Sequence, residues 1–127
     1  MTAPSLIREY DIAAQSTAVF GRVLCTARNH HFIVDGPVQN GCPGEELTPP
    51  ELFLASIAAC GVELVHVIAR DEKIAVETVN VKVHGVVDRG NQPRPNLTTF
   101  TRVELDFALI GADQAQATTL VEGFKRR

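Results

Sequence analysis

The chain has 127 residues, of which 45% are hydrophobic and 21% are charged, values typical of one globular domain that needs no disulfide or metal to hold a core. Twelve basic and fifteen acidic residues give a net charge of -3, which argues against a nucleic-acid partner, because such proteins carry a basic face. Three cysteines without paired spacing argue against a secreted disulfide framework. We therefore predict a single domain over residues 1–127, located in the cytoplasm with reduced thiols.

Neither a signal peptide nor a membrane span is expected. The N-terminal residues lack an apolar core of signal-peptide length. The most apolar run, residues 52–62, is only eleven residues long, whereas a helix needs ~20 to cross a bilayer. The sequence therefore predicts no membrane partner.

The first third of the chain favours strands and turns. Alternating residues over 19–27 and the segment 31–34 predict two strands. Residues 35–46 are rich in glycine and proline, which predicts a loop.

The best-marked element is a helix that begins after this loop. Thr48 and Glu51 have the spacing of a capping box, and Pro49 falls at the first helical position, where its missing N–H costs nothing. The apolar pattern continues to about Arg70. We expect this helix to be buried between the sheet and another surface, such as that of a second subunit, because it is apolar on nearly every side.

Two further strands and a second helix follow. Apolar and polar residues alternate over 79–84 and 103–109, with a loop at 90–96 between them. Residues 117–124 have apolar side chains at helical spacing. The order of strands, helix, strands and helix predicts an α+β domain with an antiparallel sheet.

Cys60 lies in the first helix, at the border between its apolar surface and its one polar stripe. On an ideal helix Ser56, Cys60, Glu63 and Arg70 share this stripe, with His66 just beyond. Two interpretations follow: a core cysteine, which packs like a small hydrophobe, or a nucleophile whose thiolate needs a nearby cation. The early strands offer such a cation in Arg22 or Arg28.

The remaining candidates are weaker. Cys42 sits in the glycine-rich loop, where we interpret it as an incidental exposed thiol or, alternatively, as a second redox cysteine. Cys25 is in phase with apolar neighbours and is expected in the core. The four histidines show no metal-ligand spacing, so we expect no metal and no cofactor.

The segment from Thr48 to Cys60, TPPELFLASIAAC, resembles the central-helix signature of the OsmC/Ohr family, the osmotically induced and organic-hydroperoxide-resistance proteins. The order of strands around it is also similar, and the resemblance covers roughly residues 19–127. It implies an OsmC-like α+β fold with a curved antiparallel sheet, a long buried central helix, a second C-terminal helix and an intertwined homodimer.

The resemblance also implies a site. Peroxidase members of the family reduce organic hydroperoxides at a cysteine of the central helix, which Cys60 matches. An arginine from the early strands and a glutamate at the start of the helix activate that thiol, which points to Arg22 and Glu51, with Glu51 or Glu63 orienting the arginine. The sulfenic acid formed is captured by a second cysteine. The reductant is expected to be an external thiol.

Three departures from the family pattern leave the function open. The family's second cysteine lies in a Cys-Pro step of the second helix, about where this chain ends at Arg127, and no residue matches it; the chain is either shortened or a fragment. Pro50 stands ten residues before Cys60, where peroxidase members often have their glutamate, and Glu51 has helix capping as its alternative role. Arg22 matches only loosely. The alternative function is a catalytically inactive dimer that binds an apolar small molecule in its interface cleft.

Overall fold

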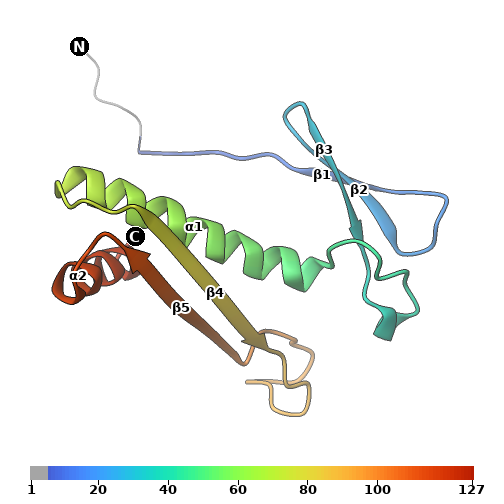
Figure 1. The fold of residues 1–127 in the computed structure, drawn as a ribbon. Coiled ribbons are helices and arrows are strands. Elements are labelled where there is room, and N and C mark those ends of the chain that lie inside the picture. The colour runs from blue at the N-terminus through green and yellow to red at the C-terminus, as the bar shows by residue number, and fades with distance from the viewer. Residues whose placement is uncertain (1–5) are drawn as a thin grey trace. The chain divides into compact units, whose positions relative to one another are not determined.

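The computed structural model describes residues 6–127, which fall into two compact units. Unit 1 extends to Leu52 and unit 2 comprises Phe53–Arg127. The helix α1 (Pro49–Asp71) begins in unit 1 and continues into unit 2 (Figure 1).

Unit 1 is built on a three-stranded antiparallel sheet in the order β1-β2-β3, formed by β1 (Ala13–Ser16), β2 (Arg22–Ala27) and β3 (His30–Asp35). The register of β2 and β3 places Arg22 opposite Asp35 at one end of the hairpin. A short 3₁₀ helix, η1 (Val38–Asn40), lies in the loop that leads to α1.

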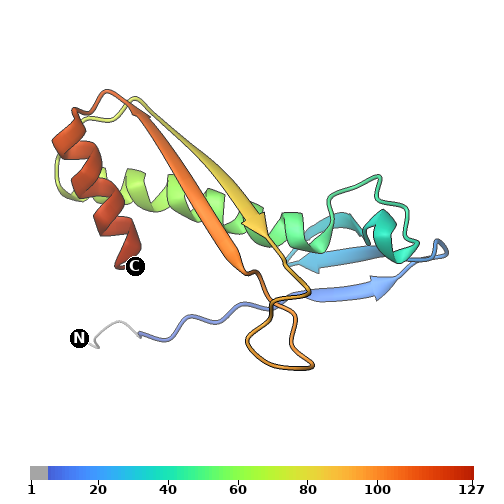
Figure 2. The same cartoon turned by 90° about the horizontal axis from the view of Figure 1, so that it is seen from below.

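Unit 2 packs helices against a two-stranded antiparallel sheet. The strands β4 (Thr78–Val86) and β5 (Arg102–Ile110) run side by side, and α2 (Gln114–Lys125) follows them (Figures 1 and 2). A Cβ atom on Gly61 of α1 would lie 3.3 Å from the ring of Phe107, so the helix comes close to the sheet at this point. The buried core of the unit consists of Val65, Ile68, Ala69 and Leu120.

The α+β class, the two helices and the antiparallel strands agree with the sequence prediction. The strands form two sheets, one in each unit. β1 was not predicted, because its sequence AAQS has no alternating pattern and all four residues are exposed. The predicted strand over 19–27 begins only at Arg22, since residues 17–21 form a turn.

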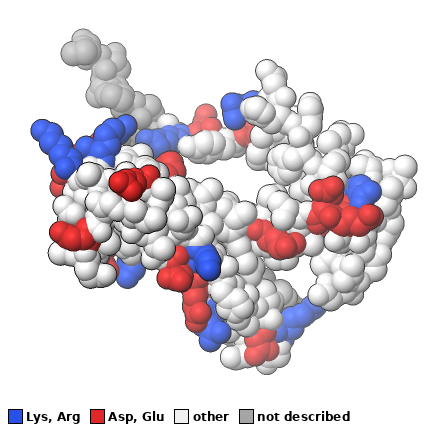
Figure 3. All heavy atoms as spheres, in the orientation of Figure 1, with Lys and Arg blue, Asp and Glu red and all other residues white. Residues whose placement is uncertain are grey.

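Within this single chain the first helix is buried on one side. Only Gly61, Val65, Ile68 and Ala69 of α1 are buried. By length and composition α1 is also apolar enough to cross a membrane, but the central helix of a soluble protein meets the same criterion, so this is weak evidence for a membrane span. Much of the face shown in Figure 3 is likewise uncharged, with charged side chains in small separate groups.

Candidate functional site

Cys60 is exposed on α1 and lies on a continuous exposed stripe of this helix. The stripe agrees with the prediction, because every residue assigned to it from the sequence is exposed: Ser56, Cys60, Glu63, His66 and Arg70. The interpretation of Cys60 as a core residue of this chain is therefore wrong. Its thiol is open to a reagent in solution, as a nucleophile requires.

The buried face of α1 begins directly after Cys60. Gly61 is buried against the β4–β5 sheet, near the side chains of Phe107 and Val81. A side chain larger than hydrogen at position 61 would press on that ring. The close approach at Gly61 thus fixes the helix against the sheet and leaves Cys60 on the opposite border.

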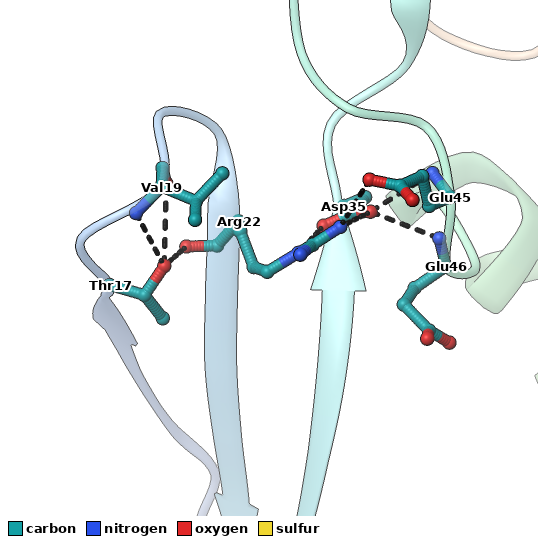
Figure 4. A network of polar contacts seen from close by, with 6 residues as sticks. All are labelled: Thr17, Val19, Arg22, Asp35, Glu45 and Glu46. Carbon is teal, nitrogen blue, oxygen red and sulfur yellow. Dashed lines mark hydrogen bonds and ion pairs between the residues drawn. The ribbon is translucent and has the colours of Figure 1, made fainter.

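Arg22 is the centre of a polar network in unit 1 (Figure 4). Its Nε donates to Oδ1 of Asp35 and its Nη2 to Oδ2, both at 2.8 Å. Nη2 also donates to Glu45 Oε1 at 3.1 Å. These two carboxylates, Asp35 first, raise the pKa of the Arg22 guanidinium above its ordinary value. The arginine is therefore a permanent cation with two of its nitrogens already bound.

Asp35 is fully buried, with a side chain that is 0% exposed. Its Oδ2 also accepts hydrogen bonds at 3.0 Å from the backbone N–H groups of Glu45 and Glu46. The Arg22 hydrogen bonds and these backbone donors hold the pKa of Asp35 well below its usual range, against the opposing effect of burial. Asp35 and Glu45 are the acidic partners of Arg22 in unit 1, and neither was singled out from the sequence.

Glu51 has a local partner at the start of α1. Its Oε1 accepts from the backbone N–H of Thr48 at 3.1 Å and from the Thr48 hydroxyl at 2.7 Å. These hydrogen bonds lower the pKa of Glu51. The Glu51 half of the predicted capping box is present, because the carboxylate accepts from the backbone N–H of Thr48. In place of the other half, the Thr48 hydroxyl donates to the same carboxylate.

Cys42 is half-buried, so its interpretation as an incidental exposed thiol is wrong. Its side chain lies against two glycines: a Cβ on Gly36 would come within 2.5 Å of the Cys42 Sγ, and Gly21 is equally close-packed. Gly21 has φ +78°, a conformation that itself favours glycine. Cys25, predicted in the core, is half-buried on β2.

The site residues inferred from the sequence are divided between the two units. Arg22 and Glu51 belong to unit 1, and Cys60 belongs to unit 2. A groove of about 540 Å³ between β5 and α2 is lined by other residues and does not include Cys60. Among residues 6–127 no three His, Cys, Asp or Glu side chains gather as metal ligands would.

Comparisons with known proteins point to one family. The sequence model of the OsmC-like protein family matches residues 42–127. No significant match was found among curated protein sequences.

Similar solved structures share the fold at low sequence identity. An OsmC-like protein from Mycoplasma pneumoniae has 15% identity and a TM-score of 0.79, over 94% of this chain and 82% of that one. An organic hydroperoxide resistance protein from Elizabethkingia anophelis has 18% identity and a TM-score of 0.75, over 97% and 85%. An organic hydroperoxide resistance protein OsmC from Legionella pneumophila has 22% identity and a TM-score of 0.67, over 96% and 85%.

Proposed function

The chain belongs to the OsmC-like protein family over residues 42–127, and we propose that it is a thiol-dependent peroxidase-like protein that reduces organic hydroperoxides through Cys60. The observation that carries the proposal is the exposure of Cys60 on the polar stripe of α1. Two of the similar structures are of proteins named for organic hydroperoxide resistance, which supports the same substrate class.

The proposed reaction begins with the thiolate of Cys60. Its sulfur attacks the terminal oxygen of the hydroperoxide, so that an S–O bond forms while the O–O bond breaks. The leaving alkoxide takes up a proton and departs as the alcohol, and Cys60 is left as a sulfenic acid. The peroxide is reduced by two electrons and the cysteine is oxidised by two.

An external thiol completes the proposed cycle. One thiol attacks the sulfenic sulfur, releases water and forms a mixed disulfide with Cys60. A second thiol then displaces Cys60 as a thiol and leaves as the disulfide of the reductant. A dithiol supplies both groups from one molecule. The two other cysteines of the chain are Cys25 and Cys42, both half-buried.

Arg22 and Glu51 have supporting roles in the proposal. Arg22 stabilises the thiolate, because a thiolate needs a neighbouring cation and the Arg22 guanidinium stays charged. Glu51 contributes a carboxylate at the start of α1, where it also caps the helix through Thr48. The apolar residues of α1 favour organic hydroperoxides over hydrogen peroxide.

A peroxide-consumption assay tests the proposal. Wild-type protein and Cys60→Ser are incubated with dithiothreitol and either cumene hydroperoxide or hydrogen peroxide, and the remaining peroxide is measured over time. We expect consumption by the wild type, with cumene hydroperoxide preferred, and only background with Cys60→Ser. Cys25→Ser is the matched control and should keep the activity. Equal background rates for wild type and Cys60→Ser would exclude the peroxidase.

That outcome would favour the alternative function, an inactive dimer that binds an apolar small molecule. The lack of a cysteine in α2 and the proline at position 50 are consistent with it. A fluorescent apolar probe titrated into the inactive wild type would then bind with a saturable signal.

The proposed assembly is an intertwined homodimer. Among the described residues of unit 1, Val34 is the one buried hydrophobic side chain, whereas Tyr10 and Phe20 are 81% and 77% exposed. A soluble monomer seldom leaves so many large apolar side chains in water. Ten large hydrophobic residues of unit 1 are exposed: Leu6, Ile7, Tyr10, Ile12, Val19, Phe20, Phe32, Ile33, Val38 and Leu47.

The mass of the protein in solution tests the dimer. Light scattering after size exclusion should give twice the chain mass of 13.8 kDa. Phe20→Glu should shift the distribution toward monomer, because it places a charge on the exposed apolar surface. Gln15→Glu adds the same charge at an exposed polar position of β1 and should not. A wild type that stays monomeric at tens of micromolar contradicts the assembly.

A further inference from the structure

Asp35 is the one charged side chain that is buried among the described residues. A buried carboxylate is stable only when it is paired and hydrogen-bonded. Asp35 accepts four hydrogen bonds: two from Arg22, one from the N–H of Glu45 and one from the N–H of Glu46. This carboxylate is thus fixed by two separate segments of unit 1, β2 and the loop that contains Glu45 and Glu46.

The two carboxylates on Arg22 hold it in different ways. Asp35 binds the Nε and Nη2 atoms together, a two-point contact that fixes the plane of the guanidinium. Glu45 makes a single bond to Nη2, and its side chain is 75% exposed. Removal of Asp35 would therefore free the orientation of Arg22, whereas removal of Glu45 would leave the two-point contact in place.

The backbone of Arg22 is held as firmly as its side chain. The hydroxyl of Thr17 donates to the Arg22 carbonyl oxygen at 3.0 Å and accepts from the N–H of Val19 at 3.2 Å (Figure 4). The Nη1 group, by contrast, has no hydrogen-bond partner within residues 6–127. One edge of a fixed cation is therefore available to an external anion.

Asp35 also fixes the segment that leads into α1. Its backbone N–H donates to the carbonyl of Leu47 at 3.0 Å, two residues before the helix begins at Pro49. The next residue, Gly36, donates to the carbonyl of Gly21 at 2.8 Å. The same aspartate thus links the cation of β2 to the chain that starts the helix.

We propose that Asp35 is a positioning residue that holds Arg22 by its Nε–Nη2 edge, so that Nη1 remains free to bind the anion that the proposed function assigns to this arginine. This inference rests on the proposed function, because that function gives Arg22 its role. Asp35 touches neither substrate nor thiol in the proposed reaction and acts only through Arg22.

The test measures the reactivity of Cys60 without requiring turnover. The rate of Cys60 alkylation by iodoacetamide at pH 7 reports its thiolate fraction, and mass spectrometry separates it from Cys25 and Cys42. Arg22→Ala should lower this rate about tenfold, the effect expected on losing the cation that the proposed function assigns to the thiolate. Asp35→Asn should lower it similarly, and the double variant no further, because Asp35 acts through Arg22. Glu45→Gln is the matched control and should stay within about twofold of the wild type.

A purely structural role for Asp35 predicts a different pattern. The inference is overturned if Asp35→Asn folds and its Cys60 is alkylated at the wild-type rate. It is also overturned if the fold-reduction of the alkylation rate in the double variant is the product of the reductions in the single variants. If Asp35→Asn does not fold, Arg22→Lys decides. It keeps the charge but lacks the two-point contact, so it should be as slow as Arg22→Ala. A wild-type rate in Arg22→Lys overturns the inference.

The two proposals can fail separately. A wild type that consumes no organic hydroperoxide, but whose Cys60 alkylation slows in Arg22→Ala and Asp35→Asn, refutes the peroxidase and keeps the positioning role. A wild type that is an active peroxidase, with alkylation unchanged in Asp35→Asn, refutes the positioning role and keeps the peroxidase.

Discussion

The contact between Gly36 and Cys42 gives a prediction whose size follows from the structure. A Cβ atom added at Gly36 would lie 2.5 Å from the Cys42 Sγ and 2.8 Å from its Cβ, closer than real Cβ contacts come. Such overpacking costs about 1–3 kcal/mol. Loss of glycine's freedom in the unfolded chain returns about 0.4–1 kcal/mol. The Gly36→Ala variant should therefore be less stable by about 1–2 kcal/mol.

The Cys42→Gly variant removes the two atoms that cause this collision. In that background Gly36→Ala should stabilise the protein by the remaining ~0.4–1 kcal/mol, so the two substitutions should be coupled by about 1–3 kcal/mol, the overpacking penalty. Urea unfolding of the wild type, both single variants and the double variant measures the coupling. Far-UV circular dichroism is the suitable probe, because the chain has no tryptophan and one tyrosine. All four proteins are compared at one concentration with reductant present.

Additive penalties in this cycle would refute the contact between Gly36 and Cys42. The result also bears on Cys42 as a second redox cysteine, since a Cys42–Cys60 disulfide requires Cys42 to leave its place against the glycines. A mass spectrum taken after one equivalent of hydroperoxide detects that disulfide directly. A strong coupling together with no disulfide would assign Cys42 a packing role alone.

Three further predictions concern stability. Leu120→Ala should lower the free energy of unfolding in urea by about 2–5 kcal/mol, because the side chain is fully buried in the core of unit 2. Thr119→Ala, at an exposed neighbouring position, should lower it far less. Equal effects would place the core elsewhere. Asp113→Ala should cost about 1 kcal/mol, because its side chain caps α2 through the N–H of Gln116 at 2.8 Å, and a loss no larger than that of an exposed alanine variant would contradict the cap. The lowered pKa of Asp35 predicts a stability contribution that is complete above the ordinary pKa of ~3.9 and is lost as the pH falls further through the pKa of the folded state. Between pH 6 and pH 2 the free energy of unfolding should therefore fall more in the wild type than in Asp35→Asn. Parallel losses in the two proteins would contradict the assignment.

The elements with strong local signals were predicted closely. In β4 and β5 exposed side chains alternate with half-buried ones, and the alternation of polar and apolar residues that causes this is visible in the sequence. The start of α1 was also predicted, because Pro49 and the pair of Thr48 and Glu51 are local signals. Such signals need no knowledge of the rest of the fold.

The Arg22 network could not be predicted in the same way. Asp35 is thirteen residues from Arg22 in the chain, and the two meet because the β2–β3 register places them opposite each other. The sequence shows an aspartate after the apolar pair Ile33-Val34, at the border of a glycine-rich loop, where a solvated carboxylate is the ordinary expectation. The available signal was a charged residue, Asp35, at the end of an apolar strand. This signal does not indicate which residue pairs with the carboxylate.

The extent to which α1 is buried could not be predicted from the spacing of its apolar residues. The helix is apolar on nearly every side, and from this a buried helix was expected. Its buried residues Gly61, Val65 and Ile68 share one face, packed against the chain's own sheet and α2. Phe53, one turn before Ser56 of the exposed stripe, is exposed as well as Cys60. The spacing of apolar residues identifies a helix surface that is unfavourable in water. It does not indicate whether the same chain or a second copy of the chain covers that surface. The apolar residues left exposed beside Cys60 are therefore the part of the pattern that the proposed dimer has to explain, and a monomeric wild type would leave them without a cause.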